Sequence, residues 1–123
     1  MKALIIDDSR ATRTILRKIL ASLQFDVVEA PDGLEALRTL HSCDDIDLAL
    51  VDWNMPQMNG LEFVHAVRRE SVYDGLRLLM VTTESEAAQM QRALEAGANE
   101  YVMKPFTADT IRSKLQLLGL GCA

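Results

Sequence analysis

Polar residues that could do chemistry stand at the ends of four short, mainly apolar runs in this sequence. They are three aspartates, a threonine and a lysine. The aspartates are Asp7, Asp8 and Asp52, and the other two residues are Thr82 and Lys104. Crowded carboxylates repel one another, which raises their pKa values unless a cation is bound. Oxygen ligands favour Mg²⁺ over a softer metal. An aspartate held beside a cation, an ammonium and a hydroxyl can act as a nucleophile and form an aspartyl phosphate.

Taken singly, each of these residues also fits an ordinary structural role. An Asp-Asp pair after a strand is common in turns and helix caps, and a lysine before a proline is commonly solvated. The chemical interpretation therefore depends on whether the fold brings the five residues to one place.

The apolar runs predict strands. Three runs are too short for a helix and have no polar face, which is typical of parallel strands covered on both sides. They are Ala3–Ile6, Leu48–Val51 and Leu78–Val81. Two mixed runs, Phe25–Ala30 and Glu100–Met103, predict strands at the edges of the sheet, where part of each strand faces water.

Amphipathic stripes between these runs predict helices, and several begin with capping signals. The spacing of a capping box is present at Asp32…Glu35, Asn59…Glu62 and Thr83…Glu86. Thr107 is the expected N-cap of the last helix, and Gly97 suits a left-handed helix end before the fifth strand.

Strand and helix therefore alternate five times, which predicts an α/β fold. Such alternation gives a parallel sheet with right-handed crossovers and helices on both faces. Three apolar strands and two mixed edges fit a single doubly wound (βα)5 sheet of the flavodoxin-like kind, with strand order 2-1-3-4-5. Sites in such folds lie beyond the carboxyl ends of the strands, where all five candidate residues meet.

Composition limits the remaining possibilities. The chain has 123 residues and a formal net charge of −5, which favours one domain over residues 1–123. An acidic chain is a poor match for a nucleic-acid-binding surface or a polybasic membrane anchor. No apolar run approaches the roughly 20 residues that span a bilayer, and the start of the chain does not resemble a signal peptide. The two cysteines, Cys43 and Cys122, show no metal-binding spacing. We therefore expect a cytoplasmic protein.

Four groups of residues together resemble the receiver domain of two-component response regulators. They are Asp7-Asp8, Asp52–Pro56 with Gly60, Thr82, and Tyr101–Phe106. The resemblance covers essentially the whole chain and is strongest to the single-domain chemotaxis regulators. It implies a phosphorylation-switched signalling module that catalyses only its own phosphoryl transfer and autodephosphorylation, and is not otherwise an enzyme.

The resemblance also implies roles for the acidic residues. Asp52 would accept a phosphoryl group from a phosphohistidine of a sensor histidine kinase. Asp8, Asp52 and the backbone carbonyl of Asn54 would bind Mg²⁺, for which Mn²⁺ could substitute. Asp7 would act mainly through a metal-bound water.

Lys104 and the threonines have implied roles around the phosphoryl group. Lys104 would pair with Asp52 and then with the phosphoryl oxygens, and the hydroxyl of Thr82 would move to the same group. Backbone N–H groups of Asn54 and Thr83 would complete the cradle. The Lys104-Pro105 peptide bond is expected to be cis.

In this family the movement of the threonine is coupled to the output surface. Tyr101 would turn inward and reshape the face formed by the fourth helix, the fifth strand and the fifth helix. Met90, Tyr101 and Lys114 are the residues we expect on that face, although the stripe containing Met90 also fits a core role. The family tunes the phosphoryl lifetime at the positions of Asn54 and Glu84, and this pair predicts a short lifetime.

The output partner is less well defined by the sequence. Family members that bind the flagellar switch often carry lysines at the start of the fourth helix, whereas this chain has Ser85–Ala88. Glu100 replaces the small residue that commonly precedes the aromatic. The resemblance thus supports the phosphoryl switch strongly, and the flagellar switch and an auxiliary phosphatase only as candidate partners.

The sequence leaves three other interpretations to consider. A receiver fragment of a larger multidomain regulator would have the same sequence. An aspartate-nucleophile phosphohydrolase commonly has a second aspartate two residues after the nucleophile, where this chain has Asn54. A flavodoxin-like cofactor binder needs a phosphate-cradling loop after the first strand, where this chain has Asp7-Asp8.

Overall fold

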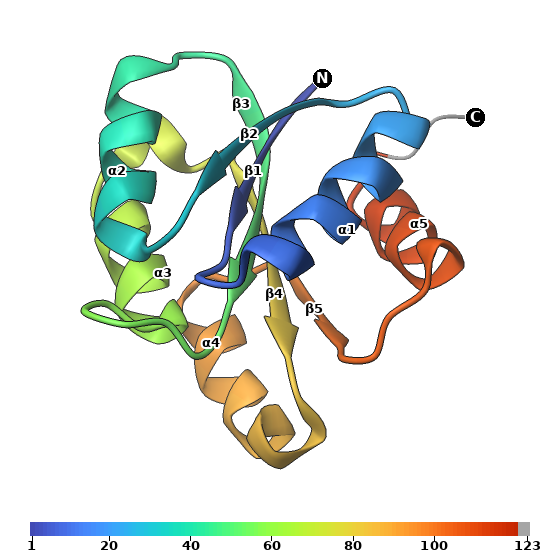
Figure 1. Ribbon diagram of the computed structural model, residues 1–123. Coiled ribbons are helices and arrows are strands. Elements are labelled where there is room, and N and C mark those ends of the chain that lie inside the picture. The colour runs from blue at the N-terminus through green and yellow to red at the C-terminus, as the bar shows by residue number, and fades with distance from the viewer. Residues whose placement is uncertain (121–123) are drawn as a thin grey trace.

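The computed structural model describes residues 1–120, except for the side chains of residues 84, 85 and 87. Strands and helices alternate along this part of the chain (Figure 1). In order, the elements are β1 (Lys2–Ile6), α1 (Arg10–Ser22), β2 (Asp26–Ala30), α2 (Gly33–Ser42), β3 (Ile46–Asp52), α3 (Gly60–Arg68), the 3₁₀ turn η1 (Ser71–Tyr73), β4 (Arg77–Thr82), the 3₁₀ segment η2 (Glu84–Gln89), α4 (Met90–Ala96), β5 (Glu100–Met103) and α5 (Ala108–Leu117). Among the described residues, no helix is long and apolar enough to cross a membrane.

The five strands form one parallel sheet in the order β2-β1-β3-β4-β5, as predicted. Apolar side chains of the central strands are buried on both faces, whereas β2 and β5 are half-exposed at the edges. This difference is the reason that the central strands have unbroken apolar runs and the edge strands do not.

The sheet separates two apolar cores. In Figure 1, α2, α3 and α4 cover one face of the sheet and α1 and α5 cover the other. Phe63 of α3 and Met90 of α4 belong to the first core. Leu16 and Leu20 of α1 belong to the second, together with Ile111 of α5. Because alternate residues of each strand point to opposite faces, neighbouring residues such as Leu4 and Ile5 contribute to different cores.

Most of the predicted helix ends are confirmed. Asp32 and Thr107 accept a hydrogen bond from the backbone three residues on, and Asn59 forms a complete capping box with Glu62. Gly97 ends α4 with a φ of 123°.

Arg68 fixes the chain around Gly97. A Cβ atom at Gly97 would lie 2.6 Å from Cγ of Arg68, so the close approach itself requires glycine. The Arg68 guanidinium donates to the backbone carbonyls of Gly97, Tyr73 and Leu76 and to the Asn99 side chain, at 2.6–3.0 Å. One side chain thus joins α3 to the turn that precedes β4 and to the turn between α4 and β5.

The predicted helix start at Thr83 is wrong, because the chain first forms η2 and the α-helix begins only at Met90. The N–H of Glu86 donates to the Thr83 carbonyl, a 3₁₀-type bond over three residues. The Glu86 carboxylate in turn accepts from the N–H and the hydroxyl of Thr83. Thr83 therefore donates its hydroxyl proton to Glu86, whereas an N-cap threonine would accept from the Glu86 N–H.

The structure describes one of the two cysteines. Cys43 is a free thiol, and Cys122 lies outside the described residues.

Candidate functional site

The residues predicted to do chemistry lie at the carboxyl ends of four strands. Asp7 and Asp8 follow β1, Asp52 ends β3, Thr82 ends β4, and Lys104 follows β5. Asp7, Asp8 and Asp52 offer carboxylate oxygens that lie within 4.8 Å of one another. The parallel sheet thus collects groups that are up to 97 positions apart in the sequence (Lys104 minus Asp7).

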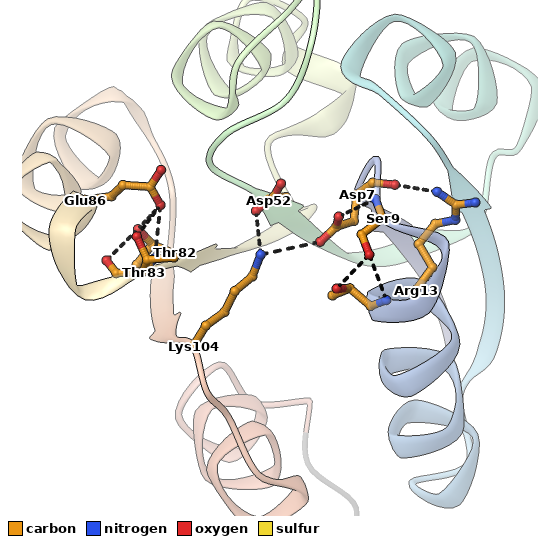
Figure 2. Close-up of polar contacts among 9 residues, drawn as sticks. Asp7, Ser9, Arg13, Asp52, Thr82, Thr83, Glu86 and Lys104 are labelled. Atoms are coloured by element: carbon orange, nitrogen blue, oxygen red, sulfur yellow. Dashed lines mark hydrogen bonds and ion pairs between the residues drawn. The ribbon is translucent and has the colours of Figure 1, made fainter.

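Lys104 lies between two of these carboxylates (Figure 2). Its Nζ atom is 3.1 Å from Oδ1 of Asp52 and 3.8 Å from Oδ2 of Asp7. The Lys104 N–H donates to the Thr82 carbonyl, which ties the lysine to the end of β4, and the bond to Pro105 is cis as expected. The ammonium therefore neutralises part of the acidic cluster in this structure.

Asp7 is held rigidly by its neighbours. Its Oδ1 atom accepts from the N–H of Ser9, and its carbonyl accepts from Nη1 of Arg13. Ser9 is also the N-cap of α1, so the helix start and the acidic site share this turn. The other carboxylate oxygen of Asp7, Oδ2, is buried and has no hydrogen-bond partner.

Burial and charge both act on the two buried aspartates. Asp7 is 1% exposed and Asp52 is 5% exposed. Burial raises the pKa of Asp7 above its ordinary value, an effect that the Ser9 N–H and Lys104 only partly offset. Burial and the charge of Asp7 raise the pKa of Asp52 to about 6, although Lys104 opposes the shift. Metal-free carboxylates in this arrangement are thus destabilised by their surroundings.

The same features fit a hard divalent cation. The three side chains supply oxygen ligands only, Asp8 is exposed to solvent, and Oδ2 of Asp7 is a buried acceptor that nothing satisfies. A bound Mg²⁺ would also lower the pKa values that burial raises. The donor set therefore fits the metal that the sequence predicts, and Asn54, whose carbonyl we expect to contribute, lies exposed in the loop after β3.

That loop holds Asp52 in place through Trp53 and Gly60. Trp53 is only 7% exposed, and its N–H donates to the Val81 carbonyl while its own carbonyl accepts from Gly60. A Cβ atom at Gly60 would lie 3.0 Å from Cα of Trp53 and 3.1 Å from the Asp52 carbonyl. Glycine at this position therefore lets α3 begin directly against the backbone that presents Asp52.

Thr82 lies at the same end of the sheet but makes different contacts. It is fully buried, and its hydroxyl donates to Oε1 of Glu86 at 3.2 Å and lies 3.3 Å from the Thr83 carbonyl. Figure 2 shows these contacts as a group separate from Asp52, Lys104 and Asp7. Sequence reasoning missed Glu86 as a site residue because its spacing from Thr83 was interpreted only as a helix cap.

The structure places Tyr101 and Lys114, two of the three residues expected on the output face, beside each other. Tyr101 is half-buried on β5, and Nζ of Lys114 lies 5.1 Å from its ring centre and 3.3 Å from Oε1 of Glu100. The negative charge of Glu100 is thus paired within this face. Met90 is instead 2% exposed, because it begins α4 with its side chain in the core, and the side chain of Glu84 lies outside the described residues.

Comparison with known proteins agrees with this geometry. Residues 3–116 match the response regulator receiver domain. The chain is 45% identical to a chemotaxis protein CheY homolog of Campylobacter jejuni, covering 98% of this chain and 95% of the relative. It is 41% identical to chemotaxis protein CheY1 of Helicobacter pylori, covering 96% of each.

Solved structures show the same likeness. Chemotaxis protein CheY4 of Vibrio cholerae superimposes with a TM-score of 0.88 at 37% identity, covering 95% of this chain and 97% of that one. A two-component response regulator with a GGDEF domain superimposes with a TM-score of 0.91 at 28% identity, covering 98% of this chain but 50% of that one. The fold, the family match and the near full-length relatives together show that this chain belongs to the response regulator receiver family and is a homologue of the CheY chemotaxis proteins.

Proposed function

We propose that this protein is a phosphorylation-switched signalling module in which Asp52 is the phosphoacceptor. The observation that carries the proposal is the contact of Lys104 with both Asp52 and Asp7, beside an exposed Asp8, at the ends of the strands. This is the arrangement that phosphoryl transfer to a carboxylate needs, because charge has to be neutralised on both the nucleophile and the transferred group.

The transfer itself needs an ionised Asp52. With a pKa of about 6, the side chain is mostly a carboxylate at neutral pH even without metal. One of its oxygens would attack the phosphorus of a phosphohistidine on a sensor histidine kinase, so that a P–O bond forms, the P–N bond breaks and the imidazole leaves with the electron pair. Mg²⁺, held by the aspartates, would stabilise the negative charge of the transferred group.

Other groups of the chain would then hold the phosphoryl group. Lys104 is already within reach of Asp52 and would pair with a phosphoryl oxygen. The Thr82 hydroxyl and the N–H groups of Asn54 and Thr83 are the donors that we assign to the remaining oxygens. Hydrolysis of this aspartyl phosphate would return the protein to its starting state, so the only reactions that it catalyses are on itself.

The added charge would be the signal. A phosphoryl group brings about −1.5 to −2 charges at neutral pH. Withdrawal of Thr82 toward this charge would open space beside β5, and Tyr101 would move with respect to Lys114 and Glu100. The face made by α4, β5 and α5 would then change its affinity for an output protein, as a shift between two populations.

Partners and lifetime follow from the family. Its CheY relatives are chemotaxis proteins, which makes a flagellar switch protein one candidate for the output partner and an auxiliary phosphatase a second contact. We expect the exchange with the kinase to take place in the cytoplasm. The pair Asn54 and Glu84 supports a short-lived phosphoryl group, which decays within hours in Mg²⁺.

A second arrangement has one specific observation in its favour. The regulator with a GGDEF domain contains a receiver of the same fold in about half of its chain. The same switch could therefore work inside a larger regulator, with the face of α4, β5 and α5 directed at a covalently attached output domain.

The proposal is tested by phosphorylation with a small donor. The protein is incubated with Mg²⁺ and acetyl phosphate, and the intact mass and Trp53 fluorescence are followed over time. We expect the mass of one phosphoryl group and a change in fluorescence, because Trp53 is buried next to Asp52.

Two variants make the test specific. Asp52→Asn should abolish the gain in mass, whereas Asp109→Asn, an exposed aspartate in the first turn of α5, should keep it. A wild-type protein that stays unmodified in Mg²⁺, or a gain in mass that survives in Asp52→Asn, would refute the assignment.

A further inference from the structure

One oxygen of Glu86 collects three hydrogen-bond donors at the end of β4. Its Oε1 atom accepts from the Thr82 hydroxyl at 3.2 Å, from the Thr83 N–H at 3.0 Å and from the Thr83 hydroxyl at 3.0 Å. Figure 2 shows these dashed contacts converging on the Glu86 carboxylate. Two of the three donors, the Thr82 hydroxyl and the Thr83 N–H, are the groups that the proposed function assigns to the phosphoryl oxygens.

We propose that Glu86 is a positioning residue that holds these two donors in the unphosphorylated state and competes for them with the phosphoryl group on Asp52. The inference rests on the proposed function and deepens it. The Glu86 carboxylate and a phosphoryl oxygen are both anionic acceptors, so each satisfies the same donors. Phosphorylation therefore exchanges one anionic partner for another at these two donors and leaves Glu86 with the third of its contacts, the Thr83 hydroxyl.

Burial explains why a partner is needed before phosphorylation. Thr82 is fully buried at the strand end, and a buried hydroxyl without a partner is unfavourable. Two acceptors are within its reach, Oε1 of Glu86 at 3.2 Å and the Thr83 carbonyl at 3.3 Å, and the carboxylate is the stronger acceptor because it is anionic. Glu86 is only half-buried, so it can supply a carboxylate oxygen to Thr82 and return to water when it is displaced. The free state is thereby stabilised with the Thr82 hydroxyl turned toward η2.

The position of Glu86 connects this exchange to the output face. Glu86 lies within η2, the 3₁₀ segment that leads directly into α4. Its own N–H is bonded to the Thr83 carbonyl, so the side chain and the backbone of Glu86 both hold the turn to the end of β4. Loss of the side-chain contacts frees one side of this turn at the start of α4.

A simple helix cap would explain less of the geometry. A cap accounts for the bond between the Thr83 N–H and the Glu86 carboxylate. It does not account for the contact with Thr82, which is the last residue of the strand. A cap alone also predicts that loss of Glu86 destabilises η2 and leaves anion binding no tighter.

The competition predicts the sign and the size of a mutational effect. Only those molecules in which Glu86 does not hold the two donors can bind a phosphoryl analogue tightly. The observed affinity is therefore the intrinsic affinity multiplied by the fraction of molecules in which the donors are free. A hydrogen bond to a charged acceptor is strong enough to keep the donors on Glu86 in about nine molecules of ten, so the fraction with free donors is about one-tenth. Glu86→Ala should therefore bind the analogue about tenfold more tightly than the wild type.

The experiment is a titration with beryllofluoride, a tetrahedral phosphoryl analogue, in Mg²⁺ with Trp53 fluorescence as the readout. Glu86→Gln loses the same charge as Glu86→Ala but keeps an amide oxygen that can accept from the same donors. Its affinity should lie between those of the wild type and Glu86→Ala. Glu95→Ala is the matched control, because it removes an exposed carboxylate from α4 that accepts from Gln91 of the same helix, and it should bind like the wild type.

A second readout follows the donor directly. In ¹H–¹⁵N spectra of the free proteins, the Thr83 amide proton should move upfield in Glu86→Ala, because its bond to a carboxylate is lost. With beryllofluoride bound, the same proton should have nearly the same shift in both proteins, because the analogue is then its partner. These spectra also show directly that each variant is folded.

The outcomes separate this inference from the proposed function. If the wild type does not respond to beryllofluoride, the proposed function fails and this inference fails with it. If the wild type responds but Glu86→Ala binds no more tightly, only this inference is overturned. Equal affinities of Glu86→Gln and Glu86→Ala would also overturn it, because the effect would then come from charge alone.

Discussion

Replacement of Asp52, the proposed phosphoacceptor, should stabilise the metal-free protein. Asp52 is buried, and burial together with the charge of Asp7 raises its pKa from 3.8 to about 6. This pKa difference of about 2.2 corresponds to about 3 kcal/mol. The folded protein loses that amount of unfolding free energy when Asp52 ionises. Asp52→Asn has no such ionisation and should be more stable by about 3 kcal/mol at pH 7.5 in EDTA.

The dependence on pH identifies the cause. A carboxyl with a raised pKa binds its proton more tightly in the folded state than in the unfolded state. The contribution of Asp52 to the free energy of unfolding should therefore fall as the pH rises from about 4 to about 6. The advantage of Asp52→Asn should be near zero below pH 4, about half of its full size at pH 5, and complete above pH 7.

The assay is urea unfolding followed by far-UV circular dichroism at pH 5 and pH 7.5. Circular dichroism is preferred because Trp53 lies next to the substituted residue. Asp109→Asn serves as the control, and because this aspartate is exposed we expect a change below about 1 kcal/mol. If Asp52→Asn is no more stable than the wild type at pH 7.5, or if its advantage is the same at both pH values, the electrostatic reasoning is refuted.

Three further perturbations have defined outcomes. Mg²⁺ at about 100 times its dissociation constant should raise the unfolding free energy of the wild type by about 2.7 kcal/mol and that of Asp52→Asn by less, as measured by urea unfolding with and without EDTA. Gly60→Ala should destabilise the protein by about 1–3 kcal/mol and change Trp53 fluorescence, because the added methyl group meets backbone atoms at 3.0–3.1 Å. Unchanged stability of this variant would contradict the close approach. Arg68→Ala should cost about 2–4 kcal/mol in thermal unfolding, because it removes the guanidinium from three backbone carbonyls, of which that of Tyr73 still accepts from the Leu76 N–H. Arg112→Ala on the exposed side of α5 should cost less than about 1 kcal/mol.

The sheet and its functional end could be predicted because the signal for each is local. The runs before Asp7, Asp52 and Thr82 are apolar throughout, which is a property of strands buried on both faces and needs no knowledge of tertiary contacts. Burial separates the two edge strands from the three central ones, and the order among them is the one known for flavodoxin-like sheets. Because all five strands are parallel, their carboxyl ends meet at one end of the sheet. The proximity of Lys104 to Asp52 is a consequence of that topology.

The segment between β4 and α4 could not be predicted in the same way. Thr83 and Glu86 have the spacing of a capping box, and the spacing does not reveal whether the Thr83 hydroxyl accepts from the Glu86 N–H or donates to the Glu86 carboxylate. The outcome depends on Thr82, whose buried hydroxyl brings a further donor to the Glu86 carboxylate. Met90 illustrates the same limit, since its stripe fits either a core or a binding face, and only the packing of α4 shows that it is buried.

The division of the interior by the sheet has a mechanical consequence for the face of α4, β5 and α5 that we propose as the output surface. Met90 and Ala93 anchor α4 in the core on one side of the sheet, and Ile111 and Leu115 anchor α5 in the core on the other. The two helices that flank β5 therefore share no common apolar interior. A small sliding of α4 along the sheet edge leaves the packing beneath α5 intact. The face can therefore change shape when only the contacts of α4 with the sheet rearrange, while the rest of the domain keeps its packing.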